Sequence, residues 1–348
     1  MWREKAKIAI SLKGRAKWHA KSGEGIEMMR MSRRALLGGA MALPSLSAWS
    51  QNFPSKPIRW ISPFAAGGNY DLTSRLVGEA MGRRLGQTVI VDNRPGAGGI
   101  VGAEAAANAP ADGYTVVMGS FSVLFVAPYL AGKPSMVPLF MPISLLSTVP
   151  MIIVAKPGGR FANIRAALAE AKAKPGTVTI GHAGNGTTNH IAILRLQVNE
   201  GVQFNIIPYK GSGPGLNDLM AGQIDLYMDQ LTTSLPHIKS GKLIGMLAMS
   251  PERVPQLPDM PSLKDIGSKP FDGGTTAGLL ARAGTPKPIL ETLNGAVVGA
   301  LKEKAVADKL AELGGVARPT TMDEFAAYMK DQEASVSELV KSGLLKPE

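Results

Sequence analysis

Three glycine-rich loops in this 348-residue chain each stand between an expected strand and an expected helix. They are Gly67-Gly68, Gly184-Asn185-Gly186-Thr187-Thr188 and Gly211-Ser212-Gly213. Such a loop leaves backbone N–H groups pointing at one spot, where the helix dipole also favours negative charge. One such loop alone is more often a tight turn, but all three follow the carboxyl ends of strands, where open α/β sheets bind ligands. The pattern predicts an anion site, and the absence of lysine from the first loop argues against a nucleotide phosphate.

Energetics narrow the class of anion. A helix N-terminus contributes at most about 2 kcal/mol to a bound anion, whereas micromolar affinity requires roughly −8 kcal/mol. Charge-assisted hydrogen bonds, about 1.5–3 kcal/mol each, must supply the difference. A small carboxylate held by several N–H and hydroxyl donors meets this requirement. The hydroxyl groups nearest to the loops belong to Ser120, Ser122, Thr187, Thr188 and Ser212.

Several ionisable residues lie beside these loops in the sequence, and Asp71, Asp229 and Lys210 each allow two interpretations. Asp71 either only caps its helix or also orients the ligand and water, and Asp229, at a strand end, allows the same two readings. Lys210 is the cation within a proposed site loop, where it either pairs with a carboxylate or faces solvent. His182 and His190 flank the second loop, and we expect ordinary structural roles for both.

Sequence motifs for catalysis, cofactors and metals are missing. The run Gly96-Ala97-Gly98-Gly99 is followed by Val101 where a dinucleotide fingerprint requires glycine, and neither a phosphate-binding P-loop nor a nucleophile elbow occurs. The histidine spacings match no common zinc pattern. We therefore expect no catalytic residue, cofactor or metal; a hydrolase with Asp71 or His182 as base stays as an alternative. Aromatic residues form only 5% of the chain, which disfavours a sugar ligand because sugars stack on aromatic rings.

The net charge of +11 is concentrated near the N-terminus. Residues 1–50 hold ten Lys or Arg and three Asp or Glu, whereas the other 298 residues hold 28 basic and 24 acidic side chains. No basic cluster with interleaved aromatics remains in the body of the chain, so no nucleic-acid partner is expected.

Residues 1–50 are interpreted as an upstream extension followed by a signal peptide. Arg33-Arg34 precede a small-residue apolar stretch, 35–48, which is too short to span a bilayer. The small residues Ala48 and Ser50 predict cleavage between Ser50 and Gln51. The sequence fits both a general secretory and a twin-arginine signal. We expect the first 30 residues to be disordered or never made, because translation could start at the methionine at position 28, 29 or 31. Export of a chain without cysteine fits a bacterial periplasm, where no disulfide would support the fold.

Beyond the leader, strand and helix patterns alternate, which predicts an α/β fold with mainly parallel sheets. The helix after the first loop is expected to bury one face, to have Asn69 or Asp71 as its N-cap and to stop at Gly86. The residues of that face are Leu72, Leu76, Val77, Met81 and Leu85. Thr321 and Glu324 form a capping box before the last helix.

The expected architecture is two α/β lobes joined by two crossings, near Pro150 and near 271–274. Residues 51–150 and 273–348 are assigned to lobe I, and residues 151–272 to lobe II. A single domain of about 300 residues is the alternative.

Ordered motifs along the chain resemble one known family. They are Pro54-Ser55-Lys56-Pro57-Ile58-Arg59, Pro63-Phe64-Ala65-Ala66-Gly67-Gly68 with Asp71, Asn93-Arg94-Pro95-Gly96-Ala97-Gly98-Gly99, Asp112-Gly113-Tyr114, Pro208-Tyr209-Lys210-Gly211-Ser212, Gly222-Gln223-Ile224-Asp225-Leu226 and Ala283-Gly284-Thr285-Pro286. From about Phe53 to the C-terminus the chain resembles the extracytoplasmic solute-binding proteins of tripartite tricarboxylate transporters, often called the Bug family.

This resemblance implies a type II, Venus-flytrap periplasmic binding protein. Such a protein closes on a small carboxylate, typically a di- or tricarboxylate or related organic acid, and delivers it to membrane permease subunits. A monomer is expected, and a receptor that signals to a membrane sensor stays as an alternative. The residues carried over to the site, together with the hydroxyls named above, are Phe64, Ala65, Gly67, Gly68, Asn69, Asp71, Ser120, Ser122, Gly184, Thr187, Thr188, Asn189, Lys210, Gly211, Ser212 and Asp229.

The chain departs from the family pattern near the expected cleft. Ala65 and Asn69 stand where the family usually has proline and a third glycine, and Tyr70 is larger than usual. Segment 131–141 lacks the usual Tyr-Asp-Pro-like turn, and His182 replaces a small residue. These differences bear on which acid is bound rather than on the fold.

Overall fold

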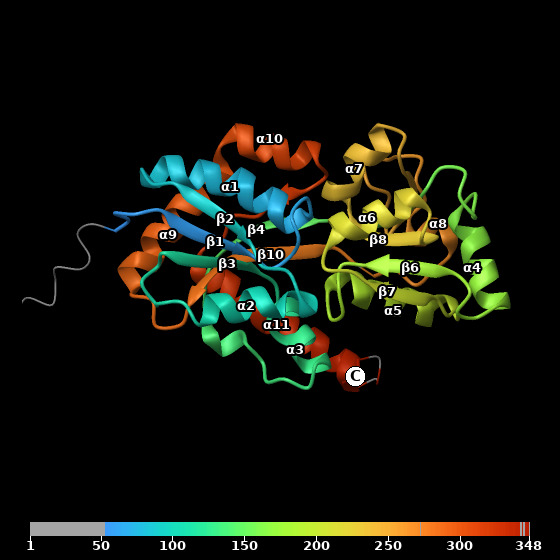
Figure 1. Ribbon diagram of the computed structural model, residues 1–348, viewed down its shortest axis with the longest axis horizontal. Coiled ribbons are helices and arrows are strands. Elements are labelled where there is room, and N and C mark those ends of the chain that lie inside the picture. The colour runs from blue at the N-terminus through green and yellow to red at the C-terminus, as the bar shows by residue number, and fades with distance from the viewer. Residues whose placement is uncertain (1–52, 272, 342, 344, 348) are drawn as a thin grey trace, which may run out of the picture. The chain divides into compact units, whose positions relative to one another are not determined.

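The computed structural model describes residues 53–271, 273–341, 343 and 345–347. The upstream extension, the signal peptide and the Ser50–Gln51 cleavage site lie outside these residues. Two separate sheets organise the described chain, each with helices on both faces (Figure 1).

The first sheet has six strands in the order β11-β4-β10-β3-β1-β2. Its strands are β1 (Ile58–Ser62), β2 (Val89–Asn93), β3 (Thr115–Gly119), β4 (Phe140–Val149), β10 (Thr275–Arg282) and β11 (Val316–Ala317). β1 runs parallel to β2 and β3, whereas β10 runs antiparallel to both β3 and β4. Helices α1 and α10 lie on one side of this sheet and α2 and α3 on the other (Figure 1).

The second sheet has five strands in the order β7-β6-β8-β5-β9. Its strands are β5 (Met151–Ala155), β6 (Thr179–His182), β7 (Asn205–Pro208), β8 (Leu226–Gln230) and β9 (Ile244–Ala248). β6 runs parallel to β7 and β8, whereas β5 runs antiparallel to β8 and β9.

The helices between these strands are mostly short. They are α1 (Asn69–Leu85), α2 (Ile100–Ala107), α3 (Ala127–Leu130), α4 (Ile164–Ala173), α5 (Thr188–Glu200), α6 (Ser212–Ala221), α7 (Leu231–Lys239), α8 (Leu263–Ile266), α9 (Lys287–Lys302), α10 (Lys304–Glu312) and α11 (Met322–Lys341). The predicted capping box of the last helix is confirmed: Glu324 N–H donates to Thr321 Oγ1 at 3.2 Å, and Thr321 N–H donates to the Glu324 carboxylate at 2.8 Å.

Each sheet has its own hydrophobic core. Buried Trp60 belongs to the core of the first sheet. In the second sheet, Ile153 packs on one face with α4 and α5, and Ile152 packs on the other with α6 and α7, as the alternation of side chains along a strand requires. The predicted two-lobed α/β fold is confirmed, whereas the exact residue boundaries of the lobes stay a prediction.

The prediction of mainly parallel sheets is wrong in part, and the crossings explain why. β4 ends at Val149, Pro150 intervenes and β5 begins the second sheet, while β10 returns to the first sheet with Thr275 opposite Val149. A strand that arrives from the other lobe enters its sheet against the local strand direction. β5 and β10, which arrive in this way, therefore run antiparallel to both of their neighbours, and the parallel pairs are confined to the βαβ units.

Two expectations for helix α1 also need correction. Gly68, rather than Asn69 or Asp71, is its N-cap, and Asp71 lies in the first turn. Val77 and Met81 are buried as predicted, but Thr73 and Ser74 are buried with them, whereas Leu72, Leu76 and Leu85 are half-buried. The buried face is rotated relative to the predicted one because the polar start of the helix enters the region between the lobes. Hydrophobic periodicity does not reveal such a contact with another lobe. The predicted stop at Gly86 is confirmed, with a left-handed φ of 64°.

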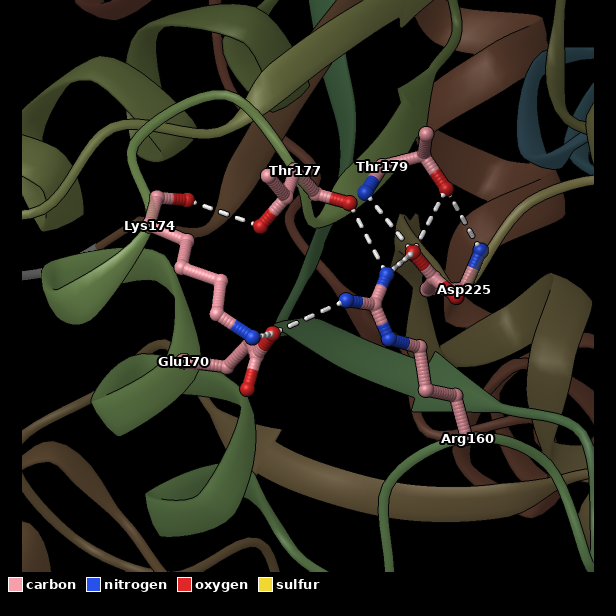
Figure 2. A network of polar contacts seen from close by, with 6 residues as sticks. All are labelled: Arg160, Glu170, Lys174, Thr177, Thr179 and Asp225. Atoms are coloured by element: carbon pink, nitrogen blue, oxygen red, sulfur yellow. Dashed lines mark hydrogen bonds and ion pairs between the residues drawn. The ribbon is translucent and has the colours of Figure 1, made fainter.

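A polar network fixes the amino ends of β6 and β8, at the edge of the sheet opposite the glycine loop that follows β6 (Figure 2). The Asp225 carboxylate accepts hydrogen bonds from the N–H and hydroxyl groups of Thr179, both at 2.9 Å, and Asp225 N–H donates to Thr179 Oγ1 at 2.8 Å. Arg160 links this pair to Glu170 at the surface. The network sets the register of two parallel strands and thereby positions the glycine loop after β6 and Gln230 at the end of β8.

Replacing Asp225 by alanine is expected to destabilise the fold, because Thr179 N–H and its hydroxyl lose a charged acceptor. We expect a loss of about 2 kcal/mol in the free energy of unfolding, measured by urea denaturation. Glu170→Gln is the matched control, because it removes surface ion pairs worth roughly 0–1 kcal/mol. Equal losses for the two variants would contradict this role of Asp225.

Candidate functional site

The loops of both lobes meet around one cavity. The starts of α1, α5 and α6 and the segment after β3 supply its walls. The lining residues are Phe64, Gly68, Asn69, Tyr70, Ser120, Ser122, Val123, Ala183, Thr187, Thr188, Asn189, Gly211, Ser212 and Gln230. No charged side chain occurs among them, so a negative ligand here would face helix N-termini, N–H groups, amides and hydroxyls.

Ten of the sixteen predicted site residues line this cavity and six do not. Those in the lining are Phe64, Gly68, Asn69, Ser120, Ser122, Thr187, Thr188, Asn189, Gly211 and Ser212. Those outside it are Ala65, Gly67, Asp71, Gly184, Lys210 and Asp229. Contact between any of these residues and a ligand stays a prediction.

Sequence reasoning missed four lining residues: Tyr70, Val123, Ala183 and Gln230. Two of them had a signal, because Tyr70 is unusually large for its loop and Gln230 directly follows Asp229 at a strand end. Val123 and Ala183 look like ordinary core residues in the sequence, and only the approach of the lobes makes them part of a wall.

Direct hydrogen bonds hold the two lobes together beside the cavity. Ala65 N–H donates to the carbonyl oxygen of Lys210 at 3.1 Å. Thr232 Oγ1 donates to Asn69 Oδ1 at 2.8 Å, and the hydroxyls of Thr188 and Thr275 lie 2.7 Å apart. The contribution of Lys210 is therefore its main chain, because its side chain is exposed and lies outside the lining.

Glycine is required where the lobes touch. A Cβ on Gly98 would overlap the carbonyl oxygen of Asn185, and a Cβ on Gly186 would overlap the backbone of Ala127. Both glycines have positive φ, 63° and 75°. The glycine loops therefore allow the two backbones to approach, in addition to leaving N–H groups exposed.

An amide network from the end of β8 positions the second loop. Asn189 Nδ2 donates to the carbonyl oxygen of Met228 at 2.9 Å, and Asn189 Oδ1 accepts from Gln230 Nε2 at 3.1 Å. Thr187 is the N-cap of α5, and its hydroxyl donates to the carbonyl oxygen of Gly184 at 2.6 Å. Because these polar atoms already have partners, Asn189 and Thr187 shape the wall more than they offer free donors.

An aromatic pair from the first loop narrows the cavity. Phe64 and Tyr70 pack edge to face with their ring centroids 4.9 Å apart. Burial raises the pKa of Tyr70 well above its ordinary value, against a hydrogen bond with Ser120 that lowers it. Tyr70 is therefore a neutral phenol at physiological pH and can donate or accept a hydrogen bond.

Asp71 supports the first loop from behind the wall. Its carboxylate accepts from Gly67 N–H at 2.9 Å and forms an ion pair with Arg75 at 2.9 Å. Burial raises the pKa of Asp71, but hydrogen bonds from Arg75, Gly67 N–H and Asn93 outweigh burial and lower it overall. These contacts favour a structural role for Asp71, which holds the first loop in place.

Asp229 is a buried carboxylate behind Ser212. It accepts a hydrogen bond from Ser234 Oγ at 2.6 Å. Burial raises the pKa of Asp229 to about 6, against hydrogen bonds from Ser212, Ser234 and Gln230 N–H that lower it. The group therefore titrates just below neutral pH at the back of a cavity that suits an anion.

His182 is buried beside the second loop and stacks on His190 with ring centroids 4.7 Å apart. Burial, followed by the neighbouring His190, lowers the pKa of His182 to about 3. Neither Asp71 nor His182 lines the cavity. Both residues proposed as the base of a hydrolase therefore lie behind the wall rather than in it.

Two α/β lobes with a cavity between their strand-to-helix loops define a two-lobed binding protein. Comparison with known proteins identifies the family: residues 73–344 match the tripartite tricarboxylate transporter family receptor, and the chain belongs to this family. The chain is 32% identical over 314 residues to protein BugT of Bordetella pertussis, covering 87% of this chain and 95% of BugT.

Solved structures agree with this assignment. The periplasmic binding protein BugD superposes with a TM-score of 0.80 at 32% identity, covering 85% of this chain and 100% of BugD. MatC from Rhodopseudomonas palustris, solved with bound malate, gives a TM-score of 0.77 at 29% identity over 83% of this chain and 100% of MatC. The family and the fold inferred from the sequence motifs are confirmed.

Replacing Asp229 by asparagine is expected to stabilise the fold at neutral pH. The folded-state pKa of about 6 lies above the ordinary 3.8, so the folded protein binds the proton more tightly and loses stability as pH rises from about 4 to about 6. Above pH 6 the ionised carboxylate costs at most roughly 3 kcal/mol.

The measurement is urea denaturation of wild type and Asp229→Asn at pH 7.5 and pH 5. We expect the variant to be the more stable at pH 7.5 and its advantage to shrink at pH 5, because the folded forms of both proteins are then largely uncharged at this position. An advantage of the same size at both pH values would show that Asp229 does not titrate as described.

Proposed function

We propose that this protein is a periplasmic receptor that captures a small carboxylate between its lobes for a tripartite tricarboxylate transporter. The proposal rests on one observation: the starts of α1, α5 and α6, from both lobes, line the same cavity, and its lining contains no charged side chain. Helix N-termini favour an anion there. The malate in MatC supports a carboxylate as the class of ligand.

Closure of the lobes is the proposed mechanism of capture. The cavity has a volume of about 20 Å³, close to the space that one water molecule needs. An organic acid must therefore enter while the lobes stand further apart, and it must widen the cavity between them. The bonds from Ala65 to Lys210 and from Thr232 to Asn69 then join the lobes around it. Closure removes water, which strengthens the hydrogen bonds to the ligand.

A thermal-shift screen against a library of mono-, di- and tricarboxylates tests the proposal. Stabilisation by at least one acid that increases with concentration as mass action requires is the expected result. Identification by mass spectrometry of an acid that co-purifies with the protein would name the ligand. No response to any acid in the library would refute the proposal.

Gly98→Ala is expected to weaken ligand affinity by preventing closure, because the new methyl group overlaps the Asn185 carbonyl. We expect a loss of about tenfold or more, which corresponds to roughly 1.4 kcal/mol, measured by calorimetric titration with the best acid of the screen. Gly132→Ala is the matched control. Gly132 has a left-handed φ of 64°, nearly the same as the 63° of Gly98, but a Cβ on Gly132 would meet no atom within 4 Å. Equal affinities of the two variants would show that closure does not depend on this contact.

Sensing is the second candidate role, since the closed protein would also suit a membrane sensor. Pull-down of membrane proteins with and without the bound acid separates the roles: permease subunits support transport, whereas a signalling receptor supports sensing. A hydrolase is disfavoured because Asp71 and His182 do not line the cavity. Chemical conversion of the bound acid by the protein would support the hydrolase instead.

Export and monomeric state belong to the same proposal. Residues 1–50 would direct the chain to the periplasm and be removed before Gln51, and the mature protein would act as a monomer. The mass of the exported protein reports the cleavage site, and light scattering reports the oligomeric state; a retained leader or a stable dimer would contradict these parts.

A further inference from the structure

A second, larger cavity of about 260 Å³ adjoins the strands that cross between the lobes. Thr148 of β4 and Thr276 of β10 line it, and their hydroxyls lie 2.8 Å apart. Helix α5, Phe271, Gly273, Gly274 and helix α11 contribute further walls. We call it the hinge cavity.

Two arginines distinguish the hinge cavity from the first one. Arg195 extends from α5 of the second lobe, and Arg318 follows β11 of the first. Among the residues that the structure describes, the lining contains no acidic side chain, and neither arginine forms an ion pair.

The contacts of the two guanidinium groups are weak. Arg195 lies 5.6 Å from the ring centroid of Phe271, and Arg318 lies 5.8 Å from that of Tyr328 and donates to Thr148 Oγ1 at 3.4 Å. Burial lowers the pKa of Arg195, because a cation without a counter-ion is costly to shield from water. An anion in this cavity would offset that cost.

The two cavities share a wall. Ser122 of the first lobe and Thr188 of the second line both of them. The first cavity is small and lined without charge, whereas the hinge cavity is larger and carries two cations. A ligand with two carboxylates that reaches past this wall would place one carboxylate in each cavity.

We propose that the hinge cavity is an anion subsite in which the guanidinium groups of Arg195 and Arg318 bind a carboxylate. Where that carboxylate is the distal group of the captured acid, the inference rests on the proposed function and makes the preferred ligand a dicarboxylate. A free small anion has the same chemistry. Guanidinium groups bind carboxylates through paired, charge-assisted hydrogen bonds, and an anion between arginines of opposite lobes would also favour closure.

Calorimetric titration of wild type, Arg195→Gln and Arg318→Gln tests this subsite. The probes are adipate and hexanoate, which have six carbons each but two and one carboxylates, and inorganic phosphate. We expect wild type to bind adipate about 10- to 100-fold more tightly than hexanoate. Each variant should lose this preference and keep the hexanoate affinity. Arg165→Gln, which removes an exposed arginine of α4, is the charge-matched control and should behave as wild type.

Stoichiometry separates the two sources of the carboxylate. One adipate per protein, with an adipate preference that requires both arginines, assigns the subsite to the distal group of the ligand. Phosphate that binds alone or together with hexanoate, and is lost in both variants, assigns it to a free anion. Circular dichroism and thermal midpoints establish that the variants are folded.

Failure of the subsite differs from failure of the proposed function. If wild type binds the acids and both arginine variants titrate with all three probes as wild type does, the subsite is refuted while the receptor stands. If no carboxylate binds to wild type, the receptor proposal fails, and the phosphate arm still decides whether the arginines hold an anion.

Discussion

The structure depends on the approach of two backbones that only glycine permits. Gly98 meets the Asn185 carbonyl and Gly186 meets Ala127, so that loops from separate lobes touch without side chains between them. The main-chain bond from Ala65 to Lys210 forms beside these contacts. A side chain at either glycine would keep the lobes apart, and the helix N-termini would then no longer face one small cavity.

Charged side chains surround the first cavity but do not line it. The lining of the first cavity is uncharged, so the field of the helix N-termini acts there without competition from a side-chain cation. Asp229 lies directly behind Ser212, where its negative charge opposes an anion unless it is protonated. Arg195 and Arg318 lie on the hinge side and supply the positive charge that the lining lacks.

Positioning comes from the opposite end of the second sheet as much as from the site. The Asp225–Thr179 bonds fix the amino ends of β6 and β8, and the carboxyl end of β8 carries the Gln230 amide that holds Asn189. The sequence motif around Asp225 is therefore structural. Its register is transmitted along rigid strands to a loop at the other edge of the sheet.

The sequence by itself determined the lobes, the family and the loops at strand ends, because alternating periodicity, glycine turns and ordered motifs are local features of the chain. It also placed the stop of α1 at Gly86, since a left-handed C-cap is read from one residue. Only the tertiary structure decided that Tyr70 and Gln230 line the cavity while Asp71, Lys210 and Asp229 do not. The direction in which a side chain points at a loop depends on what packs against it from the other lobe. The same reason accounts for the hinge cavity: Arg195 and Arg318 are 123 positions apart in the sequence, and only the folded chain brings them to one cavity.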